Sequence, residues 1–372
     1  MKHRIGLIGT GGIANFLHLP GIEACPDLEL VALCDIDPKV LNETGDKYGI
    51  GKEFRFSNHK DLINCNKVDA VDIVTSNDAH FEIAMAAAAA GKPYSLEKPV
   101  TMNAEQSAKL LAATAKLPNM VCFSYRFMAA ARFARDIIKQ NQLGVIHHIN
   151  MQYLQAWGGF EYDAPLVWRF QKDRAGSGAL GDLGCHALDL VRFILDREYL
   201  SVCAHSGTIT QNRKLVKDEV TGKETVNKTG KKGGKAIKAE TGKVDVDDFC
   251  NYMADMEDGI SASFQITRYA YGRNNYQRLE IYGSKGALVY KLDEEPGIDA
   301  IEVCIGGPMR ETFTFTKLPT PGKHKSNQMQ AFADILNKKG DGLAATIEDG
   351  HKNQLVVDAV LKSAEKRIWV NV

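Results

Sequence analysis

The sequence predicts a two-domain protein in which a doubly wound α/β domain precedes an α+β domain with a large, open, mostly antiparallel sheet. In the first part of the chain, short apolar strand-like runs alternate with helical stretches, as in parallel βαβ units. After about residue 125, the strand-like runs lengthen, alternate polar with apolar residues and are joined by hairpin-like turns. The chain of 372 residues is also longer than one typical hydrophobic core. We therefore expect domains at residues 1–124 and 125–372.

The first domain is expected to be a regular alternation of strands and helices. Runs such as VDAVDIVT are almost continuously apolar, which is typical of strands that helices cover on both faces. We expect strands at 4–9, 28–35, 52–56, 68–75, 92–98 and 120–126, and helices that end near residue 24 and span 38–48, 58–65, 80–90 and 103–116.

The second domain mixes long strands with a few helices. Strand-like runs such as FCNYMADM and ISASFQITRYAYG alternate in polarity, so one face of their sheet is expected to be buried. Helices are expected at 128–141, from near Gly181, at 326–338 and at 348–366. We expect the C-terminal helix to pack back on the first domain.

Residues 212–243 differ in composition from the rest of the chain. They contain nine lysines, five glycines and no aromatic residue, which leaves little to bury. We expect a solvated insertion between two strands; an oligomer contact and a flap over the active site are the alternatives. Nucleic-acid binding is not expected, because no aromatic side chain is interleaved with the lysines.

The overall composition is that of a soluble cytoplasmic protein. The 46 basic residues balance 46 acidic residues, so the net charge gives no reason to expect nucleic acid. No apolar run approaches the ~18 residues that span a membrane, and the N-terminus does not resemble a signal peptide. The eight cysteines are scattered without a Cys-x-x-Cys pair, so we expect reduced thiols and no metal site.

A glycine-rich turn follows the first strand. Its residues are Gly9, Thr10, Gly11, Gly12, Ile13 and Ala14. In a G-x-G-x-x-A turn, the first glycine allows the tight bend, the second lets the backbone approach a pyrophosphate, and Ala14 permits close packing of helix on strand. Asp35 follows 21 residues after the last of these, at the end of the second strand, where a carboxylate binds the adenine ribose and repels a 2′-phosphate. The pattern predicts a Rossmann domain that binds NAD rather than NADP; a simple tight turn with a surface aspartate is the alternative.

A second motif, Glu97-Lys98-Pro99, ends another strand of the first domain. Carboxyl ends of strands line the ligand crevice in a doubly wound sheet, which places Lys98 beside the nicotinamide. An ammonium group there polarises a carbonyl or holds an alcohol. A surface salt bridge followed by a turn is the alternative reading.

A third motif is the glycine-rich segment GSGALGDLGCHALD at 176–189. Asp182, His186 and Asp189 are spaced four and three apart, so they share one helical face. A histidine there accepts the hydroxyl proton as hydride leaves the same carbon, and a carboxylate fixes its position. The alternative is a helix cap at Asp182 with a packed histidine.

Together these motifs resemble the Gfo/Idh/MocA family, named for glucose-fructose oxidoreductase and inositol dehydrogenase. The resemblance is carried by GTGGIA, TSNDAHFEIA, EKP, YRF, WRF and GSGALGDLGCHALD, and covers residues 4 to about 205 and, more loosely, IEDGHKNQLVVDAVLKSA. It implies an open-sheet domain whose outer face often makes homodimers or homotetramers. The lysine-rich insertion departs from the compact family pattern.

The resemblance also implies roles for particular residues. It implies a catalytic set of Lys98, Asp182 and His186. The expected cofactor-binding residues, besides the glycine turn and Asp35, are Thr75, Asn77, His80, Glu97, Lys98, Arg126, Trp168 and Arg169.

The substrate implied by the resemblance is a sugar, cyclitol or glycoside. Tyr125, Gln155 and His324, with the catalytic set, are expected to contact it; packing roles, and for His324 an exposed loop, are the alternatives. Inositol and the C3 hydroxyl of a glucoside are the favoured substrates, oxidised with NAD. A glycoside hydrolase that uses transient oxidation and a catalytically silent sensor are the rival functions.

Overall fold

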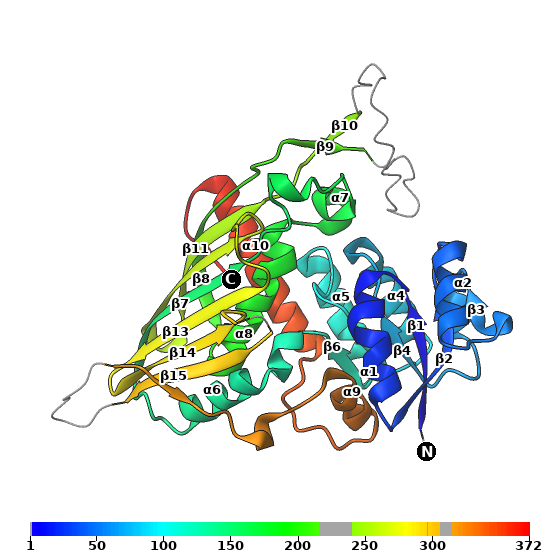
Figure 1. Cartoon of the computed structure of the whole chain (residues 1–372), viewed down its shortest axis with the longest axis horizontal. Coiled ribbons are helices and arrows are strands. Elements are labelled where there is room, and N and C mark those ends of the chain that lie inside the picture. The colour runs from blue at the N-terminus through cyan, green and yellow to red at the C-terminus, as the bar shows by residue number, and fades with distance from the viewer. Residues whose placement is uncertain (1, 216–239, 296, 306–313) are drawn as a thin grey trace.

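The computed structural model describes residues 2–215, 240–295, 297–305 and 314–372. Two large sheets lie side by side, with a small two-stranded arm above them (Figure 1). Both predicted sheet types are confirmed.

Six parallel strands form the first sheet in the order β3-β2-β1-β4-β5-β6. The order reverses between β1 and β4, and at such a switch point the carboxyl ends of the strands open onto a ligand crevice. The strands are β1 His3–Ile8, β2 Leu28–Cys34, β3 Arg55–Phe56, β4 Ala70–Ile73, β5 Tyr94–Leu96 and β6 Asn119–Val121.

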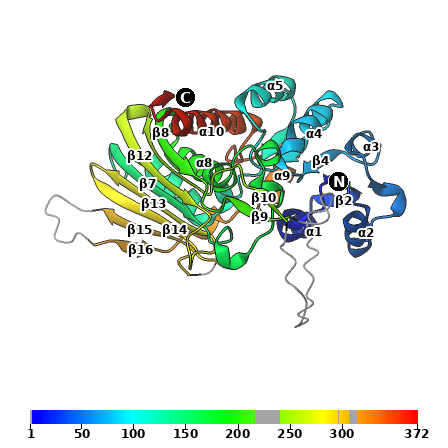
Figure 2. The ribbon, with the colours of Figure 1, turned by 90° about the horizontal axis from the view of Figure 1, so that it is seen from above.

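Helices cover both faces of this sheet (Figure 2). Side-chain caps begin three of them: Asp37 caps α2, Asn58 caps α3 and Asn103 caps α5, each by accepting backbone N–H groups that the first turn leaves free. The helices are the π-helix η1 Ala14–His18, α1 Leu19–Ala24, α2 Pro38–Lys47, α3 His59–Ile63, α4 Asn77–Ala89 and α5 Ala104–Thr114.

Two predicted strands are wrong in part. Of residues 52–56, Lys52–Phe54 form a 3₁₀ turn and only Arg55–Phe56 pair with β2, because the edge position offers a single neighbouring strand. Of residues 120–126, the sheet keeps only the part up to Val121. The chain then turns into the 3₁₀ helix η3 Ser124–Phe127, where Arg126 is buried in an ion pair that outweighs the β-propensity of its neighbours.

In the described part of the chain, the second sheet has nine strands in the order β16-β15-β14-β13-β7-β12-β11-β8-β17, and β7 and β12 are the one pair that runs parallel. Burial alternates along β11 and β12, as the sequence pattern predicts. The strands are β7 Ile146–Leu154, β8 Tyr199–Gly207, β11 Phe249–Met256, β12 Ile260–Thr267, β13 Tyr276–Gly283, β14 Gly286–Leu292, β15 Asp299–Ile305, β16 Thr316–Leu318 and β17 Val370–Asn371.

Helices pack on the inner face of this sheet. The helix α6 Ala129–Lys139 lies on β14 and β15, and α8 Cys185–Leu195 lies on β7. The π-helix η6 Leu180–Gly184 leads into α8, so the helix expected from Gly181 begins one residue earlier.

The last two helices return to the first domain. The helix α9 Gln328–Leu336 packs against α1 and β6, and α10 Ile347–Lys366 lies between α5 and β8. Asp358 on α10 accepts a hydrogen bond from the backbone nitrogen of Ala104 at 2.7 Å, at the N-terminus of α5.

The ends of the lysine-rich segment pair as β9 Asn212–Lys214 and β10 Thr241–Lys243; residues 216–239 lie outside the described residues. Arg213 anchors this arm, because it donates hydrogen bonds to the carbonyl oxygens of Gly158 and Ala164. Within the described ranges, no helix is both long and apolar enough to cross a membrane. All eight cysteines are free.

Candidate active site

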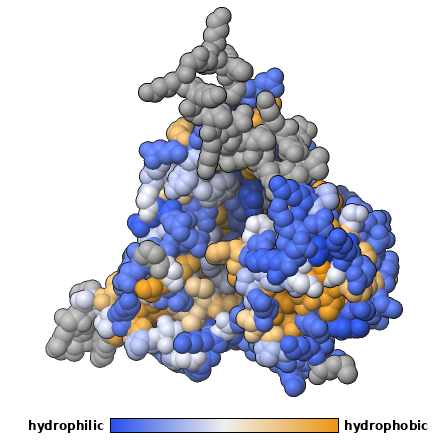
Figure 3. All heavy atoms as spheres, turned by 45° about the vertical axis from the view of Figure 1, so that its right-hand side comes forward, coloured by the Kyte–Doolittle hydropathy of each residue, from blue (hydrophilic) through white to orange (hydrophobic). Residues whose placement is uncertain are grey.

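A hollow lies between the two large sheets on the face drawn in Figure 3. The carboxyl ends of β1, β2, β4 and β5 meet at one edge of the first sheet, and the start of α8 approaches that edge from the second domain. Lys98, which follows β5, contacts Asp182 in η6. A predicted residue of the first domain and one of the second therefore meet in this crevice.

The glycine turn has the shape that a dinucleotide requires. Gly9 has a φ of 93°, and a Cβ atom there would lie 2.4 Å from the carbonyl oxygen of Val74. At Gly11 and Gly12, by contrast, a Cβ atom would meet no protein atom within 4 Å. The backbone is thus tight on its protein side and open where a pyrophosphate would approach. Ala14 is fully buried against the sheet, as predicted for the third position of the motif.

Asp35 is held at the end of β2 beside this turn. One carboxylate oxygen accepts hydrogen bonds from the backbone nitrogen and the hydroxyl group of Thr10, at 2.7 and 2.9 Å. The other accepts one from the backbone nitrogen of Asp37 at 2.9 Å. The negative charge is therefore fixed at the mouth of the turn, where it favours ribose hydroxyls over a 2′-phosphate.

A buried histidine supports the floor of the crevice. His18, on η1, lies 2.8 Å from Asp72 through Nδ1 and 2.9 Å from Glu97 through Nε2, and its side chain is fully buried. Burial would lower its pKa, but Asp72 and Glu97 outweigh burial and raise the pKa to about 10. The imidazolium therefore donates to both carboxylates at neutral pH. Glu97 also accepts from the backbone nitrogen of Lys98, which connects the nucleotide turn to the lysine.

Sequence reasoning missed His18 and Asp72. The available signal was Asp72 itself, an acidic residue inside the apolar strand VDAVDIV, since a buried carboxylate requires a partner. His18, Asp72 and Cys122 also place three potential metal ligand atoms within 4.8 Å of one another. Both ring nitrogens of His18 are already occupied by carboxylates, so this group is a hydrogen-bonded cluster.

Lys98, Asp182 and His186 meet where the two domains face each other. The Nζ atom of Lys98 donates to the carbonyl oxygen of Asp182 at 2.7 Å and to its Oδ1 atom at 3.1 Å. His186 lies one helical turn further, at the start of α8, and its Nδ1 atom is buried without a hydrogen-bond partner. An ammonium group, a carboxylate and an imidazole thus share one enclosed region.

Burial and the ion pair between Lys98 and Asp182 determine the pKa values of the three side chains. Burial would lower the pKa of Lys98 and raise that of Asp182, but their mutual attraction outweighs burial: the pKa of Lys98 is raised and that of Asp182 is held well below its usual range. Burial first, and then the Lys98 ammonium, lower the pKa of His186 to about 3. His186 is therefore uncharged at neutral pH.

The turn that carries Asp182 is held by a buried carboxylate. Asp247 accepts hydrogen bonds from the backbone nitrogens of Gly178 and Leu180, at 2.6 and 2.8 Å. A Cβ atom at Gly178 would lie 1.8 Å from the Asp247 carbonyl oxygen, so the close approach needs glycine. Arg268, fully buried, donates to Asp248 at 3.1 Å and to the carbonyl oxygen of Arg169 at 3.2 Å. Sequence reasoning missed these partners, because nothing local links them to 176–189.

A wall of uncharged polar groups faces His186. The ring of Tyr125 lies edge-on to that of His186 with centroids 4.7 Å apart. The amide oxygen of Asn275 accepts hydrogen bonds from Tyr125, Tyr153 and Gln155, at 3.0, 2.7 and 2.9 Å. The structure thus brings the predicted Tyr125 and Gln155 together. Tyr153 and Asn275 were missed, although the period of two along β7 places Tyr153 on the same face as Gln155.

Other predicted residues lie at the rim or beneath the crevice. Arg169 lies over the Trp168 ring at 4.3 Å and is close enough to help lower the pKa of Asp182. Thr75 follows β4, and Asn77 donates to the carbonyl oxygen of Ala175 at 2.9 Å, across the domains. His80 is fully buried between the carbonyl oxygens of Pro99 and Thr75, at 2.8 and 3.1 Å, so any effect on a cofactor passes through those two segments.

Two predicted residues, Arg126 and His324, make other contacts. The guanidinium group of Arg126 binds both carboxylate oxygens of Asp189, at 2.6 and 2.8 Å. Arg126 consequently points away from the strand ends into this pair. His324 packs against the ring of Phe133 at 5.2 Å, with Nε2 3.7 Å from Asp136 on α6.

Comparisons with known families agree with this geometry. A model described as an oxidoreductase family with an NAD-binding Rossmann fold matches residues 3–125, and one described as a GFO/IDH/MocA C-terminal domain matches residues 131–289. With the open glycine turn and Asp35, these matches define an NAD-dependent oxidoreductase that acts on CH–OH groups.

Full-length relatives define the family. Levoglucosan dehydrogenase of Pseudarthrobacter phenanthrenivorans is 31% identical, over 99% of this chain and 97% of that protein. Inositol 2-dehydrogenase of Rhizobium meliloti is 26% identical over 99% and 98%. A crystal structure of an oxidoreductase domain protein from Kribbella flavida, 29% identical over 100% and 99% of the two chains, superposes with a TM-score of 0.86. Levoglucosan dehydrogenase in complex with NADH and levoglucosan, 28% identical over 100% and 99%, gives 0.84. The chain belongs to the Gfo/Idh/MocA family, and the predicted resemblance is confirmed.

Replacing Asp35 tests the cofactor preference. In Asp35→Ser, we expect the KM for NAD⁺ to rise about 10- to 100-fold, because hydrogen bonds to a charged group are lost, and the preference over NADP⁺ to narrow. Initial rates with both cofactors measure this, with Asp46→Asn on the exposed end of α2 as the control. An unchanged preference in Asp35→Ser would show that another residue reads the ribose.

The raised pKa of His18 predicts that the free energy of unfolding falls at alkaline pH. Its pKa is raised from 6.5 to about 10, so its contribution is fully present below pH 6.5 and is lost as pH rises through about 10. Denaturant unfolding at a series of pH values should show this decline in the wild type and in His205→Gln, an exposed-histidine control. In His18→Gln the decline should be absent; a decline of equal size in that variant would contradict the ion-pair assignment.

Proposed function

We propose that this protein oxidises a secondary ring hydroxyl of an uncharged sugar or glycoside, with His186 as the proton acceptor and Lys98 as the group that holds the substrate oxygen. The observation that carries the proposal is the contact of Lys98 with Asp182 beside a neutral, buried His186. These three groups lie at the strand ends, where the glycine turn and Asp35 would hold NAD.

For this reaction, the protein has to supply a proton acceptor and a group that holds the substrate oxygen in place. Bound NAD⁺ supplies the acceptor for the hydride that leaves the carbinol carbon. The Lys98 ammonium donates a hydrogen bond to the substrate oxygen and stabilises the negative charge that develops on it. His186, neutral at working pH, takes the hydroxyl proton, and Asp182 keeps Lys98 charged and in place. General acid–base help of this kind contributes about 10²–10⁴-fold.

The wall opposite His186 supports an uncharged polyol as the substrate. Tyr125, Tyr153, Gln155 and Asn275 offer hydroxyl and amide groups, which donate and accept hydrogen bonds as sugar hydroxyls do. The amide oxygen of Asn275 accepts hydrogen bonds from three side chains. If one of these side chains turns to a substrate hydroxyl, Asn275 keeps the other two hydrogen bonds.

The relatives support anhydrosugars and glucosides as the first substrates to test. One relative is named levoglucosan dehydrogenase, and D-glucoside 3-dehydrogenase of Escherichia coli is 28% identical over 55% of this chain. We therefore favour levoglucosan or the C3 hydroxyl of a glucoside. Inositol is the second candidate, through the inositol 2-dehydrogenase relatives.

A substrate screen with measured stoichiometry tests the reaction type. We expect levoglucosan or a glucoside to give one NADH per sugar oxidised. Release of aglycone without net NADH would instead support a hydrolase that oxidises transiently. Absence of turnover on every sugar, with NADH still bound, would support a silent sensor and refute the proposal.

Replacing the lysine tests its role in the reaction. In Lys98→Met, we expect kcat to fall about 100-fold or more, because the charge that stabilises the substrate oxygen is removed. The affinity for NADH, measured by fluorescence titration, should change little. Lys109→Met, in an exposed ion pair with Glu105, is the matched control. Wild-type turnover in Lys98→Met would rule out the assigned role.

A further inference from the structure

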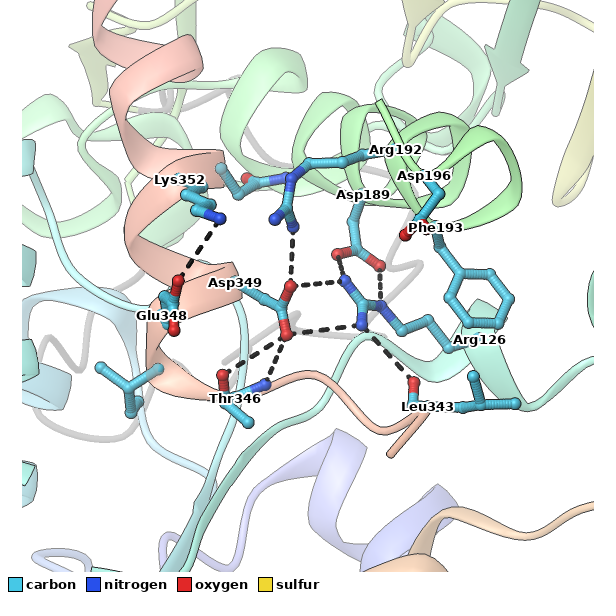
Figure 4. A network of polar contacts seen from close by, with 12 residues as sticks. Arg126, Asp189, Arg192, Phe193, Asp196, Leu343, Thr346, Glu348, Asp349 and Lys352 are labelled. Atoms are coloured by element: carbon cyan, nitrogen blue, oxygen red, sulfur yellow. Dashed lines mark hydrogen bonds and ion pairs between the residues drawn. The ribbon is translucent and has the colours of Figure 1, made fainter. Parts of the chain in front are cut away.

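Four charged residues form a network of ion pairs (Figure 4); Arg126 and Asp189 are buried, and Arg192 and Asp349 are partly exposed. Arg126 belongs to η3, where the first domain passes into the second. Asp189 and Arg192 belong to α8, and Asp349 belongs to the first turn of α10. We call these four residues the arginine clamp. Each arginine lies between carboxylates, so the charges alternate.

The contact between Arg126 and Asp189 is bidentate. The Nε and Nη2 atoms of Arg126 donate to the two oxygens of Asp189, at 2.8 and 2.6 Å. The exposed fractions of the two side chains are 6% and 2%. Two parallel hydrogen bonds in a dry environment fix the angle as well as the distance between the elements that carry them. A lysine, which is a point charge on a flexible stem, does not supply this geometry.

Asp349 extends the clamp to a third element. It lies 3.3 Å from Nη2 of Arg126 and 2.7 Å from Nη1 of Arg192, and it accepts from the backbone nitrogen of Thr346 at 2.9 Å. Arg192 also binds Glu198 at 2.6 Å. The α8 helix is therefore held at two successive turns, once through Asp189 and once through Arg192.

The clamp joins two residues of the site through their chain neighbours. Tyr125 immediately precedes Arg126, and His186 lies one helical turn before Asp189. The rings of Tyr125 and His186 meet edge to face with centroids 4.7 Å apart. We propose that Arg126 and Asp189 are positioning residues that set Tyr125 against His186. They touch no reacting atom and act through these two neighbours.

This inference rests on the proposed function, because it assigns Tyr125 and His186 to the substrate. The expected effect is on turnover. A misplacement of reacting groups by about 1 Å costs up to about 100-fold in rate, although the fold is intact. Cofactor binding at the strand ends of the first sheet should change little, since the clamp lies away from the glycine turn.

A double replacement separates positioning from stability. Arg126→Met and Asp189→Leu should each lower the Tm, because the first leaves the buried Asp189 charge without its partner and the second leaves Arg126 with Asp349 alone. The double variant should regain most of the Tm, since no unpaired charge remains, but its kcat should stay about tenfold or more below that of the wild type. Recovery of wild-type kcat in the double variant would overturn the proposal.

Two further variants keep the test decisive if the double variant does not fold. Arg126→Lys keeps the charge but loses the fork, so kcat should fall while the Kd for NADH stays within about threefold. Arg135→Lys is the matched control: Arg135 also lies over Phe193 and binds Asp196, but its chain neighbours are not site residues. Equal losses of kcat in the two variants would overturn the proposal.

Amide hydrogen exchange separates failure of this inference from failure of the proposed function. If the wild type oxidises no sugar, the proposed function is refuted, but exchange still reports on the clamp. Faster exchange at residues 124–127 and 185–189 in Arg126→Lys, and not in Arg135→Lys, would support it. Unchanged exchange in both segments would overturn it.

Discussion

The ion pair between Lys98 and Asp182 joins the two domains inside the crevice, and the rest of the site depends on it. The two side chains are only 15% and 22% exposed, so either charge alone would be costly, but together they remain ionised. Supporting contacts approach the pair from both sides. His18 holds Glu97, which fixes the backbone of Lys98, and Asp247 holds the turn that presents Asp182. The two ends of the ion pair are thus each held in place by hydrogen bonds from their own domain.

Two buried histidines illustrate how surroundings determine charge. His18 has carboxylates at both ring nitrogens, so it remains an imidazolium even without water. His186 has an ammonium group and aromatic rings as neighbours, so it remains neutral. The same side chain is therefore a charged cross-link in one place and an uncharged imidazole in the other, although neither state can be read from the residue type.

Local patterns predicted much of this structure, because their physical causes are local. The apolar runs predicted the strands, and the glycine turn predicted the nucleotide site. The spacing of Asp182 and His186 predicted a shared helical face. Residues whose partners are distant in sequence were misjudged or missed. Asp189 was expected on the same helical face as His186, but its partner Arg126, 63 residues away, was not foreseen. Asn275 gathers three side chains from other elements, and no local pattern signals that convergence.

The return of α9 and α10 to the first domain means that the polypeptide crosses between the domains more than once. A single flexible linker would let the halves swing freely, whereas several crossings confine relative motion to small rotations. The first domain also contacts segments near the C-terminus: β6 pairs with Ala345, and α10 packs on α5. A fragment cut at residue 124 would therefore expose the apolar surface that α9 and α10 cover in the whole chain.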